Sequence, residues 1–402
     1  MSVKLSLCMI VKNEESSLPQ CLGSIKDVVE EMIILDTGST DKTMQVAKDF
    51  GAQVESFSWR DDFAAARNQA LSYAQGEWVL VLDADEVLTQ EIIPSIQQAI
   101  TNPHHLVINL VRQEVGASQS PYSLISRLFR RHPEIKFTRP YHAIIDDSVA
   151  QIQQQDRKWK VVNLPSVGIL HYGYQPGTIA AKDKANRARK SMERYLTSNP
   201  KDPYVCSKLG ALYVNIGKLE EGLKLLERGL QYSEKNEAPL LFELNYHLGN
   251  VYTRRQNPNQ AAIHYQQALQ QPILPQLKLG AYNNLGGLLK AAGQLPMAKK
   301  AFDQALKIDP NFAIGYYNLG MTLKAMGLFI EAIAAYQKTI TLAPDYPWAY
   351  QNLGVTLLKI GKVTESLEAF QQAIALHESQ NPQEAKRLRQ GLQEMGLFLN
   401  NK

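Results

Sequence analysis

The stretch Trp78-Val79-Leu80-Val81-Leu82-Asp83-Ala84-Asp85-Glu86 joins a short apolar run directly to a group of carboxylates. The apolar run is typical of a buried strand, which would leave Asp83 and Asp85 at its open end. Two carboxylates so close together repel each other, and a divalent cation would offset that repulsion. Oxygen ligands favour Mg²⁺ or Mn²⁺, which also bridge to phosphate oxygens. The alternative is an acidic loop in water, and these residues alone leave both interpretations open.

Upstream of this stretch, short apolar runs alternate with amphipathic segments. Strands are predicted over 5–11, 32–35 and 53–57, and helices from residue 18, over 43–50 and over 63–73. Such alternation predicts a mostly parallel sheet with helices on both faces. In sheets of this kind, ligands bind at the carboxyl ends of the strands.

Polar residues follow the first two predicted strands. Lys12-Asn13-Glu14-Glu15 follows the first, and Asp36-Thr37-Gly38-Ser39-Thr40-Asp41 follows the second. An aspartate before a Gly-Ser-Thr turn can accept a hydrogen bond from a base or a ribose, and glycine allows close backbone approach. One of the three polar residues after the glycine can equally cap the next helix, and the two roles are compatible.

The second half of the chain contains a repeat. Leu-Gly pairs begin at Leu209, Leu248, Leu285, Leu319 and Leu353, and the last three pairs are spaced 34 residues apart. Small and aromatic residues recur at fixed distances after each pair, which indicates two closely packed antiparallel helices per repeat. The pattern resembles tetratricopeptide repeats. We expect a linking helix over 177–202, five repeats over 203–380 and a capping helix over 381–402.

Several motifs occur in series in the first 176 residues. The segments 8–14, 36–41, 63–68 and 83–85 have the order and spacing of the family 2 glycosyltransferases, which the chain resembles over about residues 3–175. The resemblance implies an α/β GT-A domain over 1–176 with a nucleotide-binding, mostly parallel sheet, joined to an all-α repeat solenoid. It also implies transfer of a sugar from a nucleotide-sugar donor with inversion at the anomeric carbon.

The resemblance also implies which residues bind the donor. Asp36 would contact the base, with help from Val11 and Glu14 at the end of the first strand. Arg67 would lie near the diphosphate or brace the nucleotide pocket, and Asp83 would face the ribose or a metal ion.

The same resemblance implies a divalent ion, Mn²⁺ or Mg²⁺, as cofactor. Its expected ligands are Asp85, Asp83 and His171. His171 resembles a late histidine that completes the metal or diphosphate site in related enzymes, and a purely structural histidine is the alternative.

The catalytic base is the least constrained part of the predicted site. Relatives with attached repeats commonly carry a His-Glu pair where this chain has His142-Ala143, and alanine cannot take a proton. Another carboxylate would then deprotonate the acceptor hydroxyl, and we favour Asp146 or Asp147 over Glu114. The alternatives are that both aspartates belong to a solvated loop, that the acceptor chemistry differs, or that activity has been lost.

Composition excludes several classes of protein. The 402 residues are 45% hydrophobic and 20% charged, which excludes a disordered, collagen-like or coiled-coil chain. A net charge of +4 is too small to indicate a nucleic-acid partner. Three cysteines cannot complete a disulfide framework, and the apolar run over 5–11 is too short to span a membrane. We therefore expect a soluble cytoplasmic protein, with peripheral membrane contact left open.

Three functions compete at this point. The first is a metal-dependent glycosyltransferase that takes a nucleotide sugar, a UDP-sugar before others, and holds a protein or peptide through its repeats. The second is a repeat scaffold with a degenerate transferase domain, which Ala143 favours and the pair Asp83 and Asp85 opposes. The third is a nucleotidyltransferase, and the lack of a glycine-rich, lysine-bearing phosphate loop near the first strand argues against it.

Overall fold

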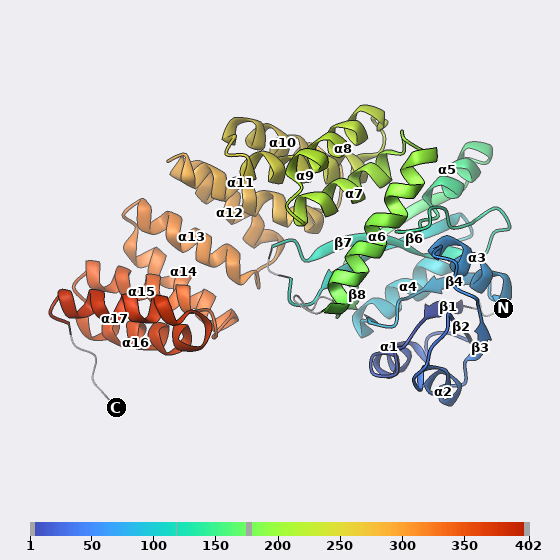
Figure 1. Cartoon of the computed structure of the whole chain (residues 1–402), viewed down its shortest axis with the longest axis horizontal. Coiled ribbons are helices and arrows are strands. Elements are labelled where there is room, and N and C mark those ends of the chain that lie inside the picture. Colours follow the sequence, from blue (N-terminus) through green and yellow to red (C-terminus); the bar gives the residue numbers. More distant parts are fainter. Residues whose placement is uncertain (1–4, 118, 174–178, 398–402) are drawn as a thin grey trace. The chain divides into compact units, whose positions relative to one another are not determined.

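A computed structural model describes residues 5–117, 119–173 and 179–397 of the chain (Figure 1). The chain forms two compact units. The first comprises Met1–Ala117 and Pro121–Tyr232, and the second comprises Ser118–Ser120 and Ser233–Lys402.

An eight-stranded sheet forms the centre of the first unit, with the strand order β3-β2-β1-β4-β7-β6-β8-β5. The strands are β1 (Leu5–Val11), β2 (Glu31–Asp36), β3 (Gln53–Ser56), β4 (Trp78–Val81), β5 (Glu86–Leu88), β6 (His105–Glu114), β7 (Tyr122–Arg130) and β8 (Lys160–His171). The α/β fold class predicted for this part of the chain is confirmed.

The sheet is mixed, with four parallel and three antiparallel strand pairings. Strands β3, β2, β1 and β4 pair in parallel, as predicted, and so do β6 and β8. Strands β6 and β7 form a hairpin and are therefore antiparallel, and β4 with β7 and β5 with β8 are antiparallel as well. Because β5 follows β4 in sequence but pairs with β8 at the far edge, the sheet curls around the turn over 82–85. That turn therefore lies beside the ends of several strands.

Helices cover both faces of this sheet. On one face lie α1 (Leu18–Ile25), α2 (Thr43–Asp49) and α4 (Ile93–Ile100), the last preceded by a short 3₁₀ turn over Gln90–Ile92. On the other face lie α3 (Phe63–Tyr73) and α5 (Asp146–Gln155). Strand β1 sends Leu7 and Met9 into the first core and Cys8 into the second. Burial on both faces explains why this strand is an unbroken apolar run in the sequence.

Three further helices complete the first unit: α6 (Ile179–Ser198), α7 (Pro203–Asn215) and α8 (Leu219–Tyr232). Asp202 caps α7 by accepting a 2.9 Å hydrogen bond from the backbone N–H of Val205. The same carboxylate accepts a 2.9 Å bond from Nε of Arg139, in the loop before α5. The predicted boundary between residues 176 and 177 lies outside the described residues.

The second unit consists of paired helices. They are α9 (Ala238–Arg254) with α10 (Pro258–Gln270), α11 (Leu279–Ala291) with α12 (Leu295–Ile308), α13 (Ala313–Ala325) with α14 (Phe329–Leu342), and α15 (Pro347–Lys359) with α16 (Val363–Gln380). A 3₁₀ turn over Pro275–Lys278 precedes α11, and α17 (Pro382–Glu394) follows the last pair.

Small residues let the helices of each pair approach closely. A Cβ atom on Gly286 would lie 2.7 Å from the ring of Phe302, which is fully buried. The recurrence of Leu-Gly followed by an aromatic residue in the sequence therefore reflects direct packing. None of the helices described is both long and apolar enough to cross a membrane.

Candidate active site

Asp36 ends strand β2 and is almost completely buried, with 3% of its surface exposed. Its Oδ1 accepts hydrogen bonds from the backbone N–H groups of Gly38 and Ser39, each at 2.9 Å. Gly38 has a φ of 103°, which a residue with a side chain rarely adopts. Within the described residues, Oδ2 of Asp36 has no hydrogen-bond partner. A buried carboxylate oxygen without a partner is unfavourable, so this atom is suited to a donor that a ligand supplies.

The turn after β1 is fastened to the turn after β2. Asn13 has a φ of 57°, and its Oδ1 accepts a 2.8 Å bond from the backbone N–H of Thr40. Its own N–H donates to Oγ of Ser39 at 2.9 Å. Ser39 and Thr40 therefore join the two strand ends, and Oδ1 of Asp41 accepts a 3.0 Å hydrogen bond from the backbone N–H of Thr43, the first residue of α2.

Val11 and Glu14 lie at the strand end next to Asp36. Val11 is in register with Asp36, and its carbonyl oxygen accepts bonds from the backbone N–H of Thr37 at 2.9 Å and from its hydroxyl at 3.0 Å. The Glu14 carboxylate accepts a 2.5 Å bond from Ser17. Both residues thus shape the turns that border the buried aspartate.

Asp83 is held between two arginines. Nη2 of Arg67, on α3, donates to Oδ1 at 2.8 Å, and Nη2 of Arg127, on β7, donates to Oδ2 at 2.9 Å. Burial alone would raise the pKa of Asp83, but the charges of Arg127 and Arg67 hold that pKa well below its usual range. The carboxylate is therefore ionised, and both of its oxygens are engaged.

One guanidinium nitrogen of Arg67 is not used in these contacts. The residue is 8% exposed, and its Nη1 has no hydrogen-bond partner among the described residues. Because β2 and β4 both flank β1 and all three run parallel, the strand ends that carry Asp36 and Asp83 are about 10 Å apart. An unpartnered acceptor and an unpartnered donor thus lie at the same edge of the sheet.

A β-bulge in β7 directs two side chains toward this edge. Asn109 of β6 lies opposite both Ser126 and Arg127, whereas the pairs on either side are one to one. Bulges of this kind re-aim side chains and are frequent near active sites. Arg127 thereby reaches Asp83, and Ser126 donates a 3.2 Å hydrogen bond to Asp146.

Glu86 is fully buried below the turn and balances two arginines. Its Oε1 accepts a 3.0 Å bond from Arg112, and its Oε2 accepts bonds from Arg127 at 3.2 Å and from the backbone N–H of Asp83 at 2.9 Å. The sequence analysis assigned no role to Glu86, Arg112 or Arg127. The signal that could have identified Glu86 was an acidic residue at the start of a short apolar strand.

Asp85 and His171 form an aspartate–histidine pair, with Oδ2 and Nε2 separated by 3.2 Å. Nδ1 of His171 lies 2.5 Å from Oε2 of Glu114, which also pairs with Arg112 at 2.9 Å. Burial alone would lower the pKa of His171, but its bonds to Asp85 and Glu114 raise it to about 9. A Cβ atom on Gly173 would lie 2.3 Å from Oδ2 of Asp85 and 2.7 Å from Nε2 of His171, so a side chain there would displace the pair.

Among the described residues, no group of three or more His, Cys, Asp or Glu side chains is arranged to hold a metal ion. Of the three predicted metal ligands, Asp83, Asp85 and His171, Asp83 has both of its oxygens engaged by arginines. The aspartate–histidine pair still offers two ligands, and Glu114 orients the imidazole from behind. Mg²⁺ commonly takes one or two protein ligands and completes its shell with phosphate and water. The side chains thus fit an ion shared with a diphosphate.

The two predicted bases differ in their surroundings. Asp147 accepts bonds from Thr138 at 2.7 Å and from Arg139 at 2.6 Å, so its carboxylate is tied to the loop before α5. Asp146 is exposed and accepts a 3.2 Å bond from Ser126. Although part of the residue is open to solvent, the protein around it desolvates the carboxylate and so raises the pKa of Asp146. Asp146 is therefore the more available of the two for a substrate proton.

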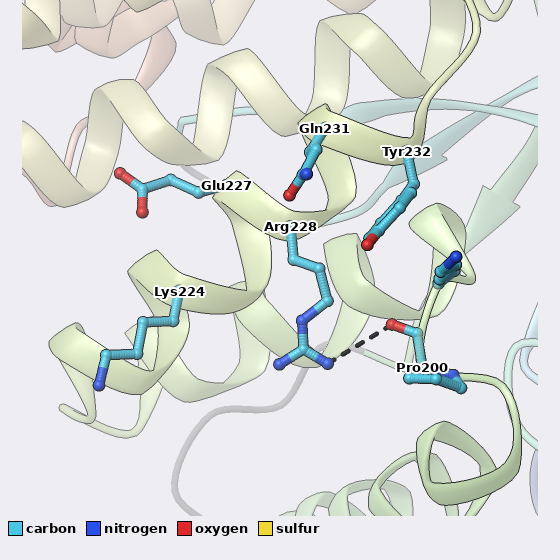
Figure 2. A pocket seen from close by; sticks show the side chains of 7 residues that line it. Pro200, Lys224, Glu227, Arg228, Gln231 and Tyr232 are labelled. Carbon is cyan, nitrogen blue, oxygen red and sulfur yellow. Dashed lines mark hydrogen bonds between the residues drawn. The ribbon is translucent and has the colours of Figure 1, made fainter.

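Two hollows in the first unit lie apart from these residues. One, of about 520 Å³, lies on α8 and carries the cations Lys201, Lys224 and Arg228. Figure 2 shows Arg228 directed at the carbonyl oxygen of Pro200, 3.5 Å away. The other, of about 600 Å³, is bordered by α3, α6 and residues 137–140. Neither is lined by the predicted donor or metal ligands.

Comparison with known families identifies two kinds of domain along the chain. Residues 6–159 match the model of the Glycosyl transferase family 2 domain. Residues 286–327 and 311–379 match two models of tetratricopeptide repeats. His171 lies beyond the matched part of the transferase domain.

A TPR repeat-containing protein of Synechococcus elongatus is 44% identical to this chain over 308 residues, 76% of each protein. The SPbeta prophage-derived glycosyltransferase SunS of Bacillus subtilis is 28% identical over 231 residues, which cover 56% of this chain and 53% of SunS. Among solved structures, the MamA protein covers 44% of this chain with 93% of its own length, at 23% identity and a TM-score of 0.39.

A GT-A-like mixed sheet, a matching transferase domain and a repeat solenoid thus occur together along one chain. The chain belongs to the family of tetratricopeptide-repeat proteins that carry an N-terminal family 2 glycosyltransferase domain.

Proposed function

We propose that this chain is a metal-dependent, inverting glycosyltransferase that takes a nucleotide-sugar donor. The observation that carries the proposal is the buried, unpartnered Oδ2 of Asp36 at the edge of a family 2 transferase sheet. A buried carboxylate oxygen at this edge of the sheet is stabilised when a ligand donates a hydrogen bond to it.

Asp36 recognises the base of the nucleotide-sugar donor by accepting a hydrogen bond from it. The ring N3–H of uracil can donate to Oδ2, which favours a UDP-sugar. Val11 and Glu14 border the base, and Asp83 faces the ribose. Nη1 of Arg67 donates to the diphosphate or braces the nucleotide pocket. The pairing of Asp83 with two arginines supports the ribose role, because its oxygens are fixed in place.

Asp85 and His171 would hold Mn²⁺ or Mg²⁺, and Glu114 would fix the imidazole. The ion, when bound, stabilises the negative charge that develops on the departing nucleoside diphosphate. Nη1 of Arg67, which has no hydrogen-bond partner among the described residues, adds a donor on the same side of the sheet.

Asp146 acts as the base. Its exposed carboxylate can remove the proton of an acceptor hydroxyl, which then attacks the anomeric carbon on the face opposite the leaving group. Attack from that face inverts the configuration. The raised pKa of Asp146 suits a group that must take a proton, whereas the ion pair of Asp147 with Arg139 suits a structural role.

The repeats would bind a protein or peptide, since stacked helical pairs present an extended surface. The three cysteines are free and buried, which is in keeping with a reducing, cytoplasmic setting. Peripheral membrane contact stays open, and no feature described above calls for a nucleic acid.

The test is release of nucleoside diphosphate from a panel of UDP- and GDP-sugars in the presence of Mn²⁺. We expect slow hydrolysis of one donor, its loss in Asp85→Ala, and its retention in Asp49→Ala, a control on the exposed surface of α2. Absence of donor binding at millimolar concentration would favour the alternative, a degenerate transferase domain on a repeat scaffold. Ala143, which packs against the core rather than supplying a carboxylate, is the observation behind that alternative.

A further inference from the structure

The hollow of about 520 Å³ on α8 gathers positively charged side chains (Figure 2). Lys224 and Arg228 lie about one helical turn apart on α8, and Lys201 comes from the segment between α6 and α7. Like charges four residues apart on a helix repel each other, and a third cation in the same hollow adds to that repulsion. We call these three residues the cation cluster.

The cation cluster is not neutralised by the protein. None of the described carboxylates forms an ion pair with any of its three members. Glu227 also lines the hollow, but Figure 2 shows its carboxylate directed away from Arg228. Among the described residues, the half-buried guanidinium of Arg228 donates a single hydrogen bond, a long one of 3.5 Å to the carbonyl oxygen of Pro200. Most of its five N–H donors are therefore available to a ligand.

An aromatic ring and an amide complete the hollow. Tyr232 lies four residues after Arg228, on the same face of α8, and is 38% exposed. Nζ of Lys201 lies 5.4 Å from the centre of the tyrosine ring, a contact that holds the ammonium group beside it. Gln231 adds an amide that can both donate and accept hydrogen bonds. A volume of about 520 Å³ is typical of small-molecule sites, so the hollow has room for more than a bare ion.

We propose that the cation cluster binds the phosphoryl group of a small phosphorylated molecule. A phosphoryl group carries a charge of about −1.5 to −2 at neutral pH, so three cations match it better than they match a singly charged carboxylate. The planar guanidinium of Arg228 pairs with two phosphoryl oxygens, and the lysines supply point charges to the third. Tyr232 and Gln231 contact the rest of the molecule.

This site is separate from the transferase chemistry. None of the residues that line the hollow is a predicted ligand of the donor or the metal ion. The inference therefore stands or falls independently of the proposed glycosyl transfer.

A soluble molecule fits this hollow better than a lipid headgroup does. Segments that bind anionic membranes commonly carry about four to eight lysines and arginines, whereas the hollow carries three cations. A phosphorylated lipid headgroup is the competing outcome of the test.

The test uses the full chain in EDTA, which keeps divalent ions away from the proposed metal site, and follows inorganic phosphate and phenyl phosphate by phosphorus NMR. Lys201→Gln/Lys224→Gln should weaken the binding of both probes at least about ten-fold. The matched control Lys218→Gln/Lys300→Gln makes the same charge change at exposed positions outside the hollow and should alter binding less than about two-fold. Lys218 is a close match, because its Nζ also lies over a tyrosine ring, 5.4 Å from the centre of Tyr213.

Two further variants test the geometry of the site. Arg228→Lys keeps the charge but removes the planar guanidinium, and it should weaken phosphate binding about three- to ten-fold. Phenyl phosphate should bind more tightly than inorganic phosphate, and Tyr232→Ala should remove that difference while leaving inorganic phosphate within about two-fold. Lowering the pH from about 8 to about 5 should weaken binding, because the phosphoryl group then loses its second charge.

Equal weakening by the test and control lysine variants would overturn the proposal, as would a failure of both probes to bind. Vesicles that contain phosphatidic acid form the last arm of the experiment. If they bind with the same dependence on the cation cluster while neither soluble probe binds, the hollow is a membrane contact and the proposed small-molecule site is wrong.

Discussion

Replacing Asp36 with asparagine should separate donor recognition from stability. The amide keeps one oxygen for the N–H groups of Gly38 and Ser39, which hold the turn after β2. It replaces the unpartnered Oδ2 with an NH₂ group. A base that presents a ring N–H would then meet a donor instead of an acceptor.

The size of the effect follows from the chemistry of that oxygen. A hydrogen bond to a charged, buried acceptor contributes about 1.5–3 kcal/mol, so Asp36→Asn should raise the Kd for UDP about 10- to 150-fold. The free protein should change little, by less than about 1 kcal/mol in the free energy of unfolding, because the lost oxygen has no partner among the described residues.

Isothermal titration with UDP in the presence of Mn²⁺ measures the first quantity, and urea denaturation of the free protein measures the second. CDP is the ligand control, because cytosine has no ring N–H and should be affected less. Asp49→Asn, on the exposed surface of α2, is the variant control. The reasoning fails if Asp36→Asn binds UDP within about two-fold of the unaltered protein, or if lost affinity is accompanied by an equal loss of stability.

Three other substitutions test the remaining parts of the site. Glu86→Ala removes the carboxylate that two buried arginines share, so it should lower the free energy of unfolding by about 3–5 kcal/mol, measured by urea denaturation. The control Glu91→Ala, at an exposed position, should have almost no effect. Asp146→Asn should slow donor turnover about 10²- to 10⁴-fold without weakening UDP binding, whereas Asp147→Asn should slow donor turnover far less. Similar rates in the two variants would show that Asp146 is not the base. The raised pKa of Asp146 also places the acidic loss of activity at a higher pH than an ordinary aspartate would, because the base works only when deprotonated. Gly173→Ala should weaken Mn²⁺ binding, followed by electron paramagnetic resonance, by at least about ten-fold, because the added methyl group would overlap the aspartate–histidine pair; unchanged Mn²⁺ affinity would show that the pair is not the metal site.

Elements could be predicted from the sequence where their packing requires a particular type of residue at each position. Buried strands read as unbroken apolar runs, so the ends of β1, β2 and β4 could be placed, and with them Val11, Asp36 and Asp83. The helical pairs were equally readable, because small residues at a fixed period are needed wherever an aromatic ring packs against a neighbouring helix.

The sequence was uninformative where contacts join distant strands. The β6–β7 hairpin and the return of β5 to β8 make the sheet mixed, and neither leaves a local pattern. The contact between Arg127 and Asp83 occurs at the bulge in β7, which a run of alternating residues does not reveal. Asp146 and Asp147 are neighbours with the same side chain, and contacts from other segments distinguish them: Ser126 of β7 binds Asp146, and Arg139 binds Asp147.

The bond between Arg139 and Asp202 has a consequence for how this protein can be divided. Arg139 has a φ of 73° and a side chain 8% exposed, and its guanidinium is neutralised by Asp147 on one side and Asp202 on the other. Asp202 belongs to the start of α7, so a fragment that stops after the sheet would remove one of the two carboxylates that pair with Arg139, beside the proposed base. A recombinant catalytic module should therefore extend through Tyr232, and a gene fusion that transplants the transferase would have to take the first helical hairpin with it.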